Sequence, residues 1–335
     1  MRCLCCGLEI TSPSEQEQKD QWHRHCVKDF FGTDALPYIE ISESGLEEIA
    51  SASAARGLTI PGVQKKISLH HESGDGRSNR LTLVDYPTGY ILKPQTKEYA
   101  NLPESEFLAM QMSELLGVRV VPYALIRLKD SLAYITKRID RKIGKSPDGE
   151  KVTRLAMEDF CQLSERLSED KYNGSYEACA RIIKKYSFQP GLDLAELFIR
   201  IVSSFLIGNS DMHLKNLSLI EKIPASRTFE LSLSYDILPV NVVDPLDTDE
   251  LALSLNGKKN KLEREDFLKF AEYCELNQTA AEKMMAKIYS KTDECIQLCQ
   301  NSHLSNAMKN QMVDLVHARS ERFTPNLCNF RRNSE

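Results

Sequence analysis

A long apolar stretch that runs straight into a polar segment is the feature that most constrains the fold of this chain. Residues 197–208 are apolar enough to form a buried helix, and Asn209-Ser-Asp-Met-His-Leu-Lys-Asn216 follows at once. Asp236 lies twenty positions further on, ahead of an apolar turn. A single aspartate or asparagine in a loop usually caps a helix or forms a turn. Asp211, Asn216 and Asp236 together are better explained by one site at which a buried helix and two loops meet.

The order of these three residues matches the requirements of phosphoryl transfer. That reaction needs an aspartate to orient the attacking hydroxyl group, and an asparagine and a second aspartate to hold Mg²⁺ on the phosphates. Asn216 follows Asp211 by five positions, the spacing of the corresponding pair in protein kinases, where the other metal-binding aspartate lies downstream. We therefore predict Asp211 as a catalytic residue and Asn216 and Asp236 as Mg²⁺ ligands.

Two further residues of the polar segment are predicted to have catalytic supporting roles. His213 lies between Asp211 and Asn216, and we expect it to act as a hydrogen-bonding group of the loop rather than as a base. Lys215 is expected either to neutralise the terminal phosphate of a nucleotide or merely to face Asp211. The residues alone leave both alternatives open.

Lys93 is the best candidate for a lysine that binds the phosphates of ATP. It lies in the apolar segment Tyr90-Ile-Leu-Lys-Pro94, where a lone lysine is costly unless it is paired. In kinases such a strand lysine holds phosphates and pairs with a glutamate on a nearby helix, here Glu104 or Glu106. The alternative is a lysine on an edge strand that points to solvent.

The remaining ATP contacts are predicted on two segments. Residues 57–62 form a loop with glycine and proline whose backbone amides could approach phosphates closely. It matches neither the kinase glycine-rich pattern nor the Walker sequence, so an ordinary turn is the alternative. Residues 137–139 end a strand and join two predicted lobes, where adenine would bond to the backbone. The predicted contacts are Thr59, Ile60, Gly62, Val63, Lys137, Arg138 and Ile139.

The first thirty residues contain a separate cluster of cysteine and histidine. Cys3 and Cys6 form a Cys-x-x-Cys pair, and His23 and Cys26 form a His-x-x-Cys pair. Two such pairs on short turns can supply the four ligands of a tetrahedral Zn²⁺ site. Cysteine-rich sequence without a metal is the competing interpretation. The spare donors nearby are Cys5 and His25.

Composition and charge exclude several classes of function. The chain has 335 residues with 43 basic and 48 acidic side chains, a balance that argues against nucleic-acid binding as its main activity. No stretch approaches the ~20 apolar residues of a membrane span. The N-terminus lacks the apolar core of a signal peptide, and cysteines scattered through predicted helices are typical of a reducing compartment. We expect a cytoplasmic protein, with delivery into another cell as an alternative.

The pattern of predicted elements favours an α+β fold with two lobes, like that of a protein kinase. The β-rich N-lobe contains a predicted hairpin of residues 80–85 and 89–94 and a helix over 102–116. Helices dominate after residue 158 and form the C-lobe. The predicted units are residues 1–45 with the Cys/His cluster, 46–138 as the N-lobe with the phosphate loop, 139–323 as the C-lobe with the catalytic residues, and 324–335 as a mobile tail.

Taken together, these motifs resemble the HipA family of toxin serine/threonine kinases over roughly residues 57–320. The Asp-x-His-x-Lys-Asn core and the Tyr-Asp-Ile-Leu segment are the most specific of them. The segments that carry the resemblance are Thr59–Lys66, Tyr90–Pro94, Lys137–Arg141, Arg154–Gln162, Gly208–Asn216, Tyr235–Pro239 and Leu251–Lys258.

The resemblance implies a biochemical role for the chain. It implies ATP and Mg²⁺ as cofactors, and phosphorylation of an aminoacyl-tRNA synthetase that inhibits translation. It assigns Asp211, Asn216, Asp236 and Lys93 the roles given above. Family members autophosphorylate a serine of the phosphate loop; here Thr59 occupies one such position, and a nearby proline stiffens the loop.

The resemblance also implies partners. It is strongest to the short HipT form, so a small HipS-like protein would supply an N-terminal subdomain, and a HipB-like helix-turn-helix antitoxin would bind DNA. This chain itself is expected to bind neither nucleic acid nor a membrane. The competing functions are a small-molecule phosphotransferase, a kinase-like secreted effector with another protein substrate, and a binding module without activity.

Overall fold

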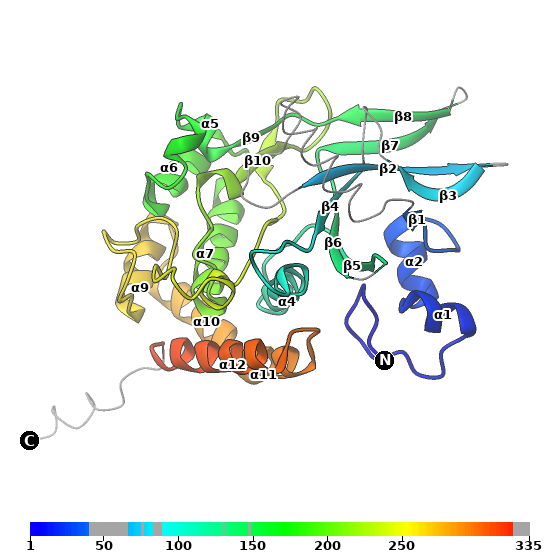
Figure 1. Cartoon of the computed structure of the whole chain (residues 1–335). Coiled ribbons are helices and arrows are strands. Elements are labelled where there is room, and N and C mark those ends of the chain that lie inside the picture. Colours follow the sequence, from blue (N-terminus) through cyan, green and yellow to red (C-terminus); the bar gives the residue numbers. More distant parts are fainter. Residues whose placement is uncertain (40–65, 75–76, 83–88, 130, 147–148, 324–335) are drawn as a thin grey trace, which may run out of the picture.

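The computed structural model describes residues 1–39, 66–74, 77–82, 89–129, 131–146 and 149–323. It has a sheet-rich part and a helical part (Figure 1). The main sheet has six strands in the order β1-β3-β2-β4-β6-β5, in which β1 and β3 are parallel and the other neighbours antiparallel. Its strands are β1 (Tyr38–Ile39), β2 (Ile67–Gly74), β3 (Arg77–Thr82), β4 (Tyr90–Pro94), β5 (Tyr123–Arg127) and β6 (Leu132–Lys137).

Smaller β elements and helices complete the described structure. The strands β7 (Arg141–Ser146) and β8 (Gly149–Arg154) form a hairpin, and β9 (Met157–Asp159), β10 (Ser218–Glu221) and β11 (Phe229–Leu231) form a small sheet. The helices are α1 (Glu15–Asp20), α2 (Arg24–Phe31), α4 (Leu102–Leu115), α5 (Phe160–Leu163), α6 (Tyr176–Tyr186), α7 (Pro190–Ile207), α8 (Val240–Val243), α9 (Arg264–Tyr273), α10 (Gln278–Tyr289), α11 (Thr292–Asn301) and α12 (Asn306–Glu321). Among the described helices, none has the length and apolar character to cross a membrane.

The pairing of the strands corrects one prediction. We expected residues 80–85 and 89–94 to form a hairpin, but β3 and β4 lie on opposite sides of β2. The hairpin partner of β3 is therefore β2, while β4 pairs with β2 and β6. Alternation of apolar and polar residues shows which face of a strand is buried, not which neighbour it pairs with, and so it could not distinguish the two arrangements.

Helix α7 is buried along most of its length and delivers the polar segment found in the sequence. It ends at Gly208, whose φ of +78° is a left-handed conformation that favours glycine. A Cβ atom at this position would lie 3.1 Å from a side-chain carbon of Leu315. The helix therefore stops at a turn that only glycine fits well, and Asn209 begins the candidate catalytic loop immediately after it.

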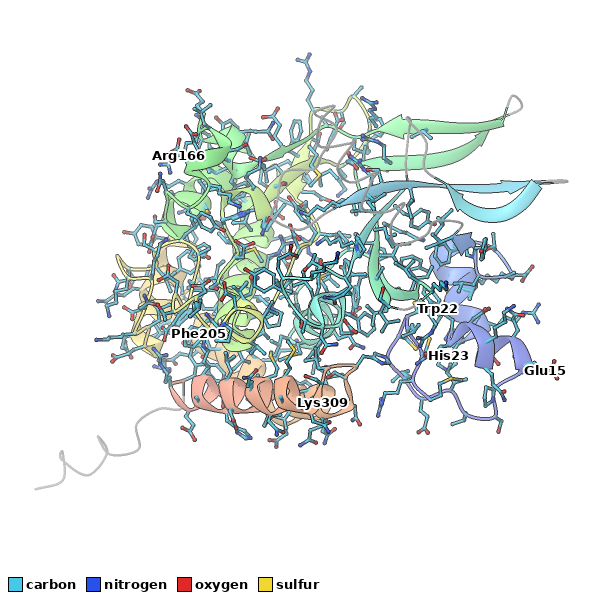
Figure 2. The ribbon with its side chains drawn as sticks, in the orientation of Figure 1. Glu15, Trp22, His23, Arg166, Phe205 and Lys309 are labelled. Carbon is cyan, nitrogen blue, oxygen red and sulfur yellow. The ribbon has the colours of Figure 1, made fainter. Side chains whose placement is uncertain are left out.

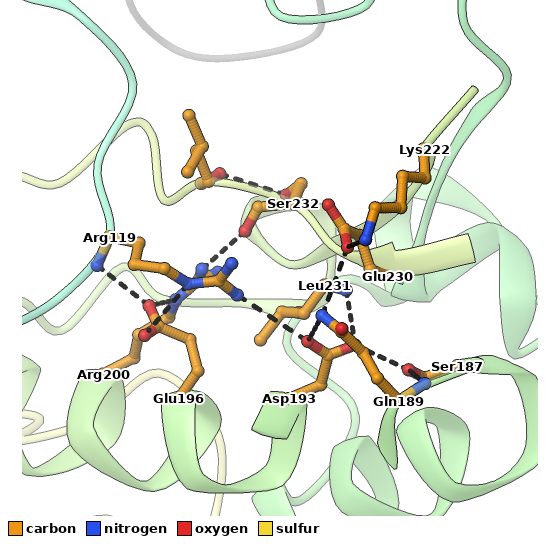
Figure 3. Close-up of polar contacts among 11 residues, drawn as sticks. Arg119, Ser187, Gln189, Asp193, Glu196, Arg200, Lys222, Glu230, Leu231 and Ser232 are labelled. Carbon is orange, nitrogen blue, oxygen red and sulfur yellow. Dashed lines mark hydrogen bonds and ion pairs between the residues drawn. The ribbon is translucent and has the colours of Figure 1, made fainter. Parts of the chain in front are cut away.

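A network of buried polar side chains ties α7 to the segment that leads to Asp236 (Figure 3). The guanidinium group of Arg200 donates to Glu196 over 2.9 Å and to the carbonyl oxygen of Ser232 over 2.5 Å. Glu196 also accepts a hydrogen bond from the backbone amide of Arg119, 3.0 Å away, and the carbonyl of Arg119 accepts one from Ser234. The helix that leads into one candidate loop thus also fixes the segment that leads to Asp236.

Replacing Arg200 with methionine is expected to lower the free energy of unfolding by about 3–5 kcal/mol, because it leaves the carboxylate of Glu196 buried with fewer partners. Lys222→Met is the matched control within the same network, since the Lys222 ammonium lies 3.8 Å from Glu230 and is half exposed. The control should lower the free energy of unfolding by less than about 1 kcal/mol. Urea denaturation measures both values, and equal decreases in the two variants would contradict a special role of Arg200 in the network.

Candidate active site

Lys93 lies at the centre of a cluster of charged side chains between β4, α4 and the segment that contains Asp236. Its side chain is only 4% exposed, and its ammonium group pairs with the carboxylates of Glu106 and Asp236. Lys66 donates to the other carboxylate oxygen of Asp236 over 2.7 Å. Of the two glutamates considered from the sequence, Glu106 is thus the partner of Lys93. Glu104 instead accepts a hydrogen bond from Asn101.

The charges in this cluster determine one another's ionisation. Burial alone would raise the pKa of Asp236, but the ammonium groups of Lys66 and Lys93 outweigh it and hold that pKa well below its usual range. Burial also raises the pKa of Glu106 to about 7, although Lys93 opposes the shift. Asp236 is therefore a carboxylate at neutral pH, and it has a left-handed backbone conformation with φ of 60°, which is strained for most residues and is frequent at functional sites.

The loop after α7 holds Asp211 and Asn216 together. The side-chain carbonyl of Asn209 accepts a hydrogen bond from the backbone amide of Asp211 over 3.1 Å. The side-chain amide of Asn216 donates to the backbone carbonyl of Asp211 over 2.8 Å. Asn216 itself is buried. These two bonds close the loop on itself and fix the backbone of Asp211 relative to Asn216.

The two neighbours of this pair behave differently. His213 is buried beside Asp211, with its Nε2 atom 3.7 Å from the carboxylate, and burial lowers the pKa of His213, so that its ring is neutral at physiological pH. The ammonium group of Lys215 donates to Asp159 over 2.8 Å. This contact was not among the alternatives considered for Lys215, and both of those stay predictions.

Two cavities meet at the candidate metal ligands. The larger, about 760 Å³, is bordered by Asp211 and His213. The smaller, about 280 Å³, is bordered by Lys93, Glu106 and residues 137–139. The residues that border both cavities are Lys66, Lys215, Asn216 and Asp236. Carboxylate and amide oxygens are ligands that Mg²⁺ prefers, so Asn216 and Asp236 suit this ion, and they stand where the two cavities join.

The predicted adenine contacts lie at the smaller cavity, but part of their backbone already has partners. Lys137, Arg138 and Ile139 all border it. The backbone amide of Lys137 donates to Pro122, and that of Arg138 donates to Gly89 over 2.9 Å. Adenine would therefore use other backbone groups of this segment. The predicted phosphate-loop residues lie outside the described part of the chain: Thr59, Ile60, Gly62 and Val63.

Two residues of the site were missed in the sequence. Lys66 precedes the strand β2 and does not lie inside an apolar strand, so the reasoning that singled out Lys93 did not reach it. Tyr172 gave no signal, because it comes from a segment between short helices. Its hydroxyl group donates to the carboxylate of Asp211 over 2.5 Å, and burial together with that carboxylate raises the pKa of Tyr172. The phenol therefore stays protonated and occupies one side of Asp211.

Replacing Tyr172 with phenylalanine is expected to lower the KM for the phosphate acceptor about fivefold, because a hydrogen bond worth about 1 kcal/mol no longer competes for Asp211. Steady-state phosphorylation kinetics at saturating ATP measure this. Tyr186→Phe is the control, since Tyr172 and Tyr186 are both 40% exposed. A fall in kcat with unchanged KM would instead mean that Tyr172 positions Asp211 and does not compete with the acceptor.

The Cys/His cluster forms as predicted from its spacing. Cys3, Cys6, His23 and Cys26 each offer a ligand atom, and these atoms lie within 4.8 Å of one another. The arrangement can hold a metal ion. Cys5 and His25 are not part of this set, although the Nε2 atom of His25 lies 3.4 Å from the sulfur of Cys26.

Comparison with known proteins identifies relatives. The family model for the HipA-like C-terminal domain matches residues 58–296. A Sinorhizobium fredii protein named "Putative kinase Y4dM" is 30% identical over 234 residues, which are 66% of this chain and 54% of that protein. A Haemophilus influenzae protein named "Putative kinase" is 26% identical over 270 residues, 74% of this chain and 77% of that protein. This chain thus matches only about half the length of the Sinorhizobium protein.

Solved structures share the fold. HipA of Shewanella oneidensis, in complex with HipB and operator DNA, has a TM-score of 0.65 at 19% identity and covers 79% of this chain and 65% of its own. The Helicobacter pylori proinflammatory kinase CtkA has a TM-score of 0.51 at 19% identity and covers 76% of this chain and 90% of its own. The α+β fold of these two kinases is therefore the fold of this chain, which confirms the predicted fold class.

Proposed function

Because this chain belongs to the family with a HipA-like C-terminal domain, we propose that it is an ATP-dependent serine/threonine protein kinase. The observation that carries this proposal is the junction of the two cavities. Lys66, Asn216 and Asp236 border both of them, while Lys93 borders only the smaller and Asp211 only the larger. A nucleotide in the smaller cavity would thus present its terminal phosphate to an acceptor beside Asp211.

The residues of the site suit direct transfer of that phosphate. Lys93 and Lys66 supply positive charge for phosphate oxygens, and Asn216 and Asp236 would hold Mg²⁺, which neutralises the charge of the phosphates when bound. Asp211 accepts a hydrogen bond from a hydroxyl group, as it does from Tyr172, and so can orient an acceptor serine or threonine. His213 would act as a hydrogen-bonding group of the loop, and Lys215 would supply a positive charge beside it. Residues 137–139 would contact adenine.

Family membership and the resemblance of the motifs support a more specific role. We propose that the kinase is the toxin of a toxin–antitoxin system and phosphorylates an aminoacyl-tRNA synthetase. A helix-turn-helix antitoxin would be its DNA-binding partner, by analogy with the HipA structure that contains HipB and operator DNA. A HipS-like partner and autophosphorylation at Thr59 stay predictions.

The charge of the larger cavity favours a basic acceptor. Six carboxylates border it, against the three lysines Lys66, Lys171 and Lys215; the carboxylates are those of Glu98, Glu169, Asp211, Asp236, Asp244 and Asp247. Opposite charges attract a substrate and orient it, so we expect lysine or arginine beside the acceptor hydroxyl of the protein substrate. The same acidic lining also suits a cationic small molecule, which keeps a small-molecule phosphotransferase as the second candidate.

Phosphorylation in a bacterial lysate tests the proposal. Wild type and Asp211→Asn are each incubated with Mg²⁺ and labelled ATP, and phosphosites are mapped by mass spectrometry. One phosphoprotein that appears only with wild type supports the kinase and names its substrate, and phosphate on Thr59 in the same data supports autophosphorylation. Consumption of ATP without a phosphoprotein would favour the small-molecule acceptor. No transfer of any kind would contradict both candidates.

A further inference from the structure

We propose that Cys3, Cys6, His23 and Cys26 bind one structural Zn²⁺ ion that fastens the N-terminal segment to the main sheet. A tetrahedral site with Zn–S bonds near 2.3 Å and Zn–N bonds near 2.0 Å places sulfur and nitrogen ligands roughly 3.6 Å apart. The Nδ1 atom of His23 lies 3.4 Å from the sulfur of Cys6 and 3.8 Å from that of Cys26. These two nitrogen–sulfur separations are thus close to those of a zinc site, and all four ligand atoms lie within 4.8 Å of one another.

The surroundings of Cys3 are those of a thiolate ligand. Backbone amides of Cys5 and His23 both point at its sulfur, each at 3.4 Å, and Cys3 is fully buried. Amide donors around a ligand sulfur stabilise its negative charge and orient it toward a metal. Two amide donors on one buried sulfur therefore favour a thiolate ligand over an ordinary thiol.

The turn after the first cysteine pair also has the shape that a metal-binding loop needs. Gly7 follows Cys6 directly and has a φ of +75°, a conformation that favours glycine. A Cβ atom there would lie 2.2 Å from the side-chain nitrogen of Gln111 on α4. Gln111 donates to the carbonyl of Cys6. The loop is therefore pressed closely against the helix that carries Glu106.

The segment held by this site covers an edge of the sheet. Strand β5 is the last strand in the sheet order, and an uncovered edge strand exposes unpaired backbone groups. The amide of Leu125 donates to the carbonyl of Leu4 over 2.7 Å, and the carbonyl of Leu125 accepts from the indole nitrogen of Trp22 over 3.2 Å. Both backbone groups of Leu125 are thus satisfied by residues next to the proposed ligands.

The apolar side chains of the segment pack into the core of the sheet and not around a separate core of their own. Trp22 is buried and packs against Phe30 and Phe31, and Phe31 packs against Tyr90 of β4. Figure 2 shows Trp22 and His23 next to each other where the N-terminal segment meets the sheet. Small units of this size usually need a metal or disulfides for stability. The proposed zinc site supplies that cross-link.

Metal analysis of the purified full-length chain tests the ligand set. Wild type should contain about one Zn²⁺ per chain, and Cys6→Ser and His23→Ala less than about a tenth of that. Cys5→Ser is the matched control and should keep its zinc. Replacement of zinc by Co²⁺ should give the visible bands of a tetrahedral ion with thiolate ligands, which keeps the test valid if a variant fails to fold. Wild type without zinc, even after refolding with Zn²⁺, would overturn the site, and loss of zinc from Cys5→Ser would overturn the ligand set.

The single tryptophan of the chain reports on the structural role. Removal of zinc from wild type by a chelator should shift Trp22 fluorescence to longer wavelength, because the side chain is 1% exposed in the folded segment. Added Zn²⁺ should reverse the shift. Complete removal of zinc with an unchanged emission spectrum would overturn the proposal that the metal fastens this segment. Neither measurement uses ATP, so its outcome is independent of the kinase proposal.

Discussion

Replacing Asp211 with asparagine is expected to lower the rate of phosphoryl transfer about 10³-fold or more while leaving ATP binding nearly unchanged. An asparagine keeps the size of the side chain but is a much weaker acceptor for the proton of the attacking hydroxyl group, and a factor of 10³ corresponds to about 4 kcal/mol of barrier. Asp211 borders only the larger cavity, so Asp211→Asn leaves unchanged the residues of the smaller cavity, where we propose that the nucleotide binds.

Two measurements on the same protein preparation check this expectation. Single-turnover transfer gives the rate, and calorimetric titration with a non-hydrolysable ATP analogue and Mg²⁺ gives the affinity. Asp244→Asn is the matched control, since Asp244 borders the same cavity. At saturating acceptor, where attraction of the acceptor no longer limits the rate, its transfer rate should stay within about threefold of wild type. Similar losses of transfer rate in both variants would indicate a general effect of charge in the cavity. Weaker binding of the analogue by Asp211→Asn would argue against the assignment of the nucleotide to the smaller cavity and the acceptor to the larger one.

Replacing Asp236 with asparagine is expected to abolish Mg²⁺-dependent nucleotide binding and to destabilise the fold. Asp236 is the carboxylate partner of both Lys66 and Lys93, whose side chains are only 8% and 4% exposed. Breaking a buried ion pair by removing one partner costs about 3–5 kcal/mol, because the other charge stays buried. Asparagine tolerates the left-handed conformation of this position, so backbone strain does not account for the effect.

The pH dependence distinguishes this charge effect from a loss of packing. The pKa of Asp236 is depressed in the folded protein, so the stability that its ionisation contributes is complete above the unfolded pKa of about 3.9 and is lost as the pH falls through the lower folded value. The part of the difference in unfolding free energy between wild type and Asp236→Asn that comes from ionisation of Asp236 should therefore shrink as the pH falls below about pH 4.

A double-mutant cycle separates the contribution of Lys66 from that of the other charges. Urea denaturation of Lys66→Met, Asp236→Asn and the double variant should give a favourable coupling of about 1–3 kcal/mol. Asp244→Asn combined with Lys66→Met is the control pair and should be additive. A coupling near zero would mean that the contact between Lys66 and Asp236 contributes little to the stability of the protein.

Much of the candidate site could be predicted because its residues are close in sequence. Asp211 and Asn216 belong to one loop, so their spacing limits the distance between them in almost any fold. Lys93 was recognisable because a lysine within an apolar strand needs a carboxylate partner. The Cys/His cluster was recognisable because two closely spaced ligand pairs on short turns are the pattern of a tetrahedral metal site.

The remaining features depended on contacts between residues far apart in the chain. Glu104 and Glu106 differ by two positions on a helix, which places them on different faces, and only the packing of α4 on the sheet decides which of them meets Lys93. Tyr172 is 39 positions from Asp211, and no local pattern brings them together.

The sequence by itself determined the candidate site of this protein: the candidate catalytic loop, its metal-ligand candidates, the buried lysine and the cysteine pairs. These are carried by residue type and short spacing, which the covalent chain enforces. The tertiary structure alone decided the partner of Lys93, the second lysine on Asp236, the tyrosine on Asp211 and the order of the strands. Each of these depends on which surfaces bury one another, and the free energy of that packing is shared among residues that no short segment contains.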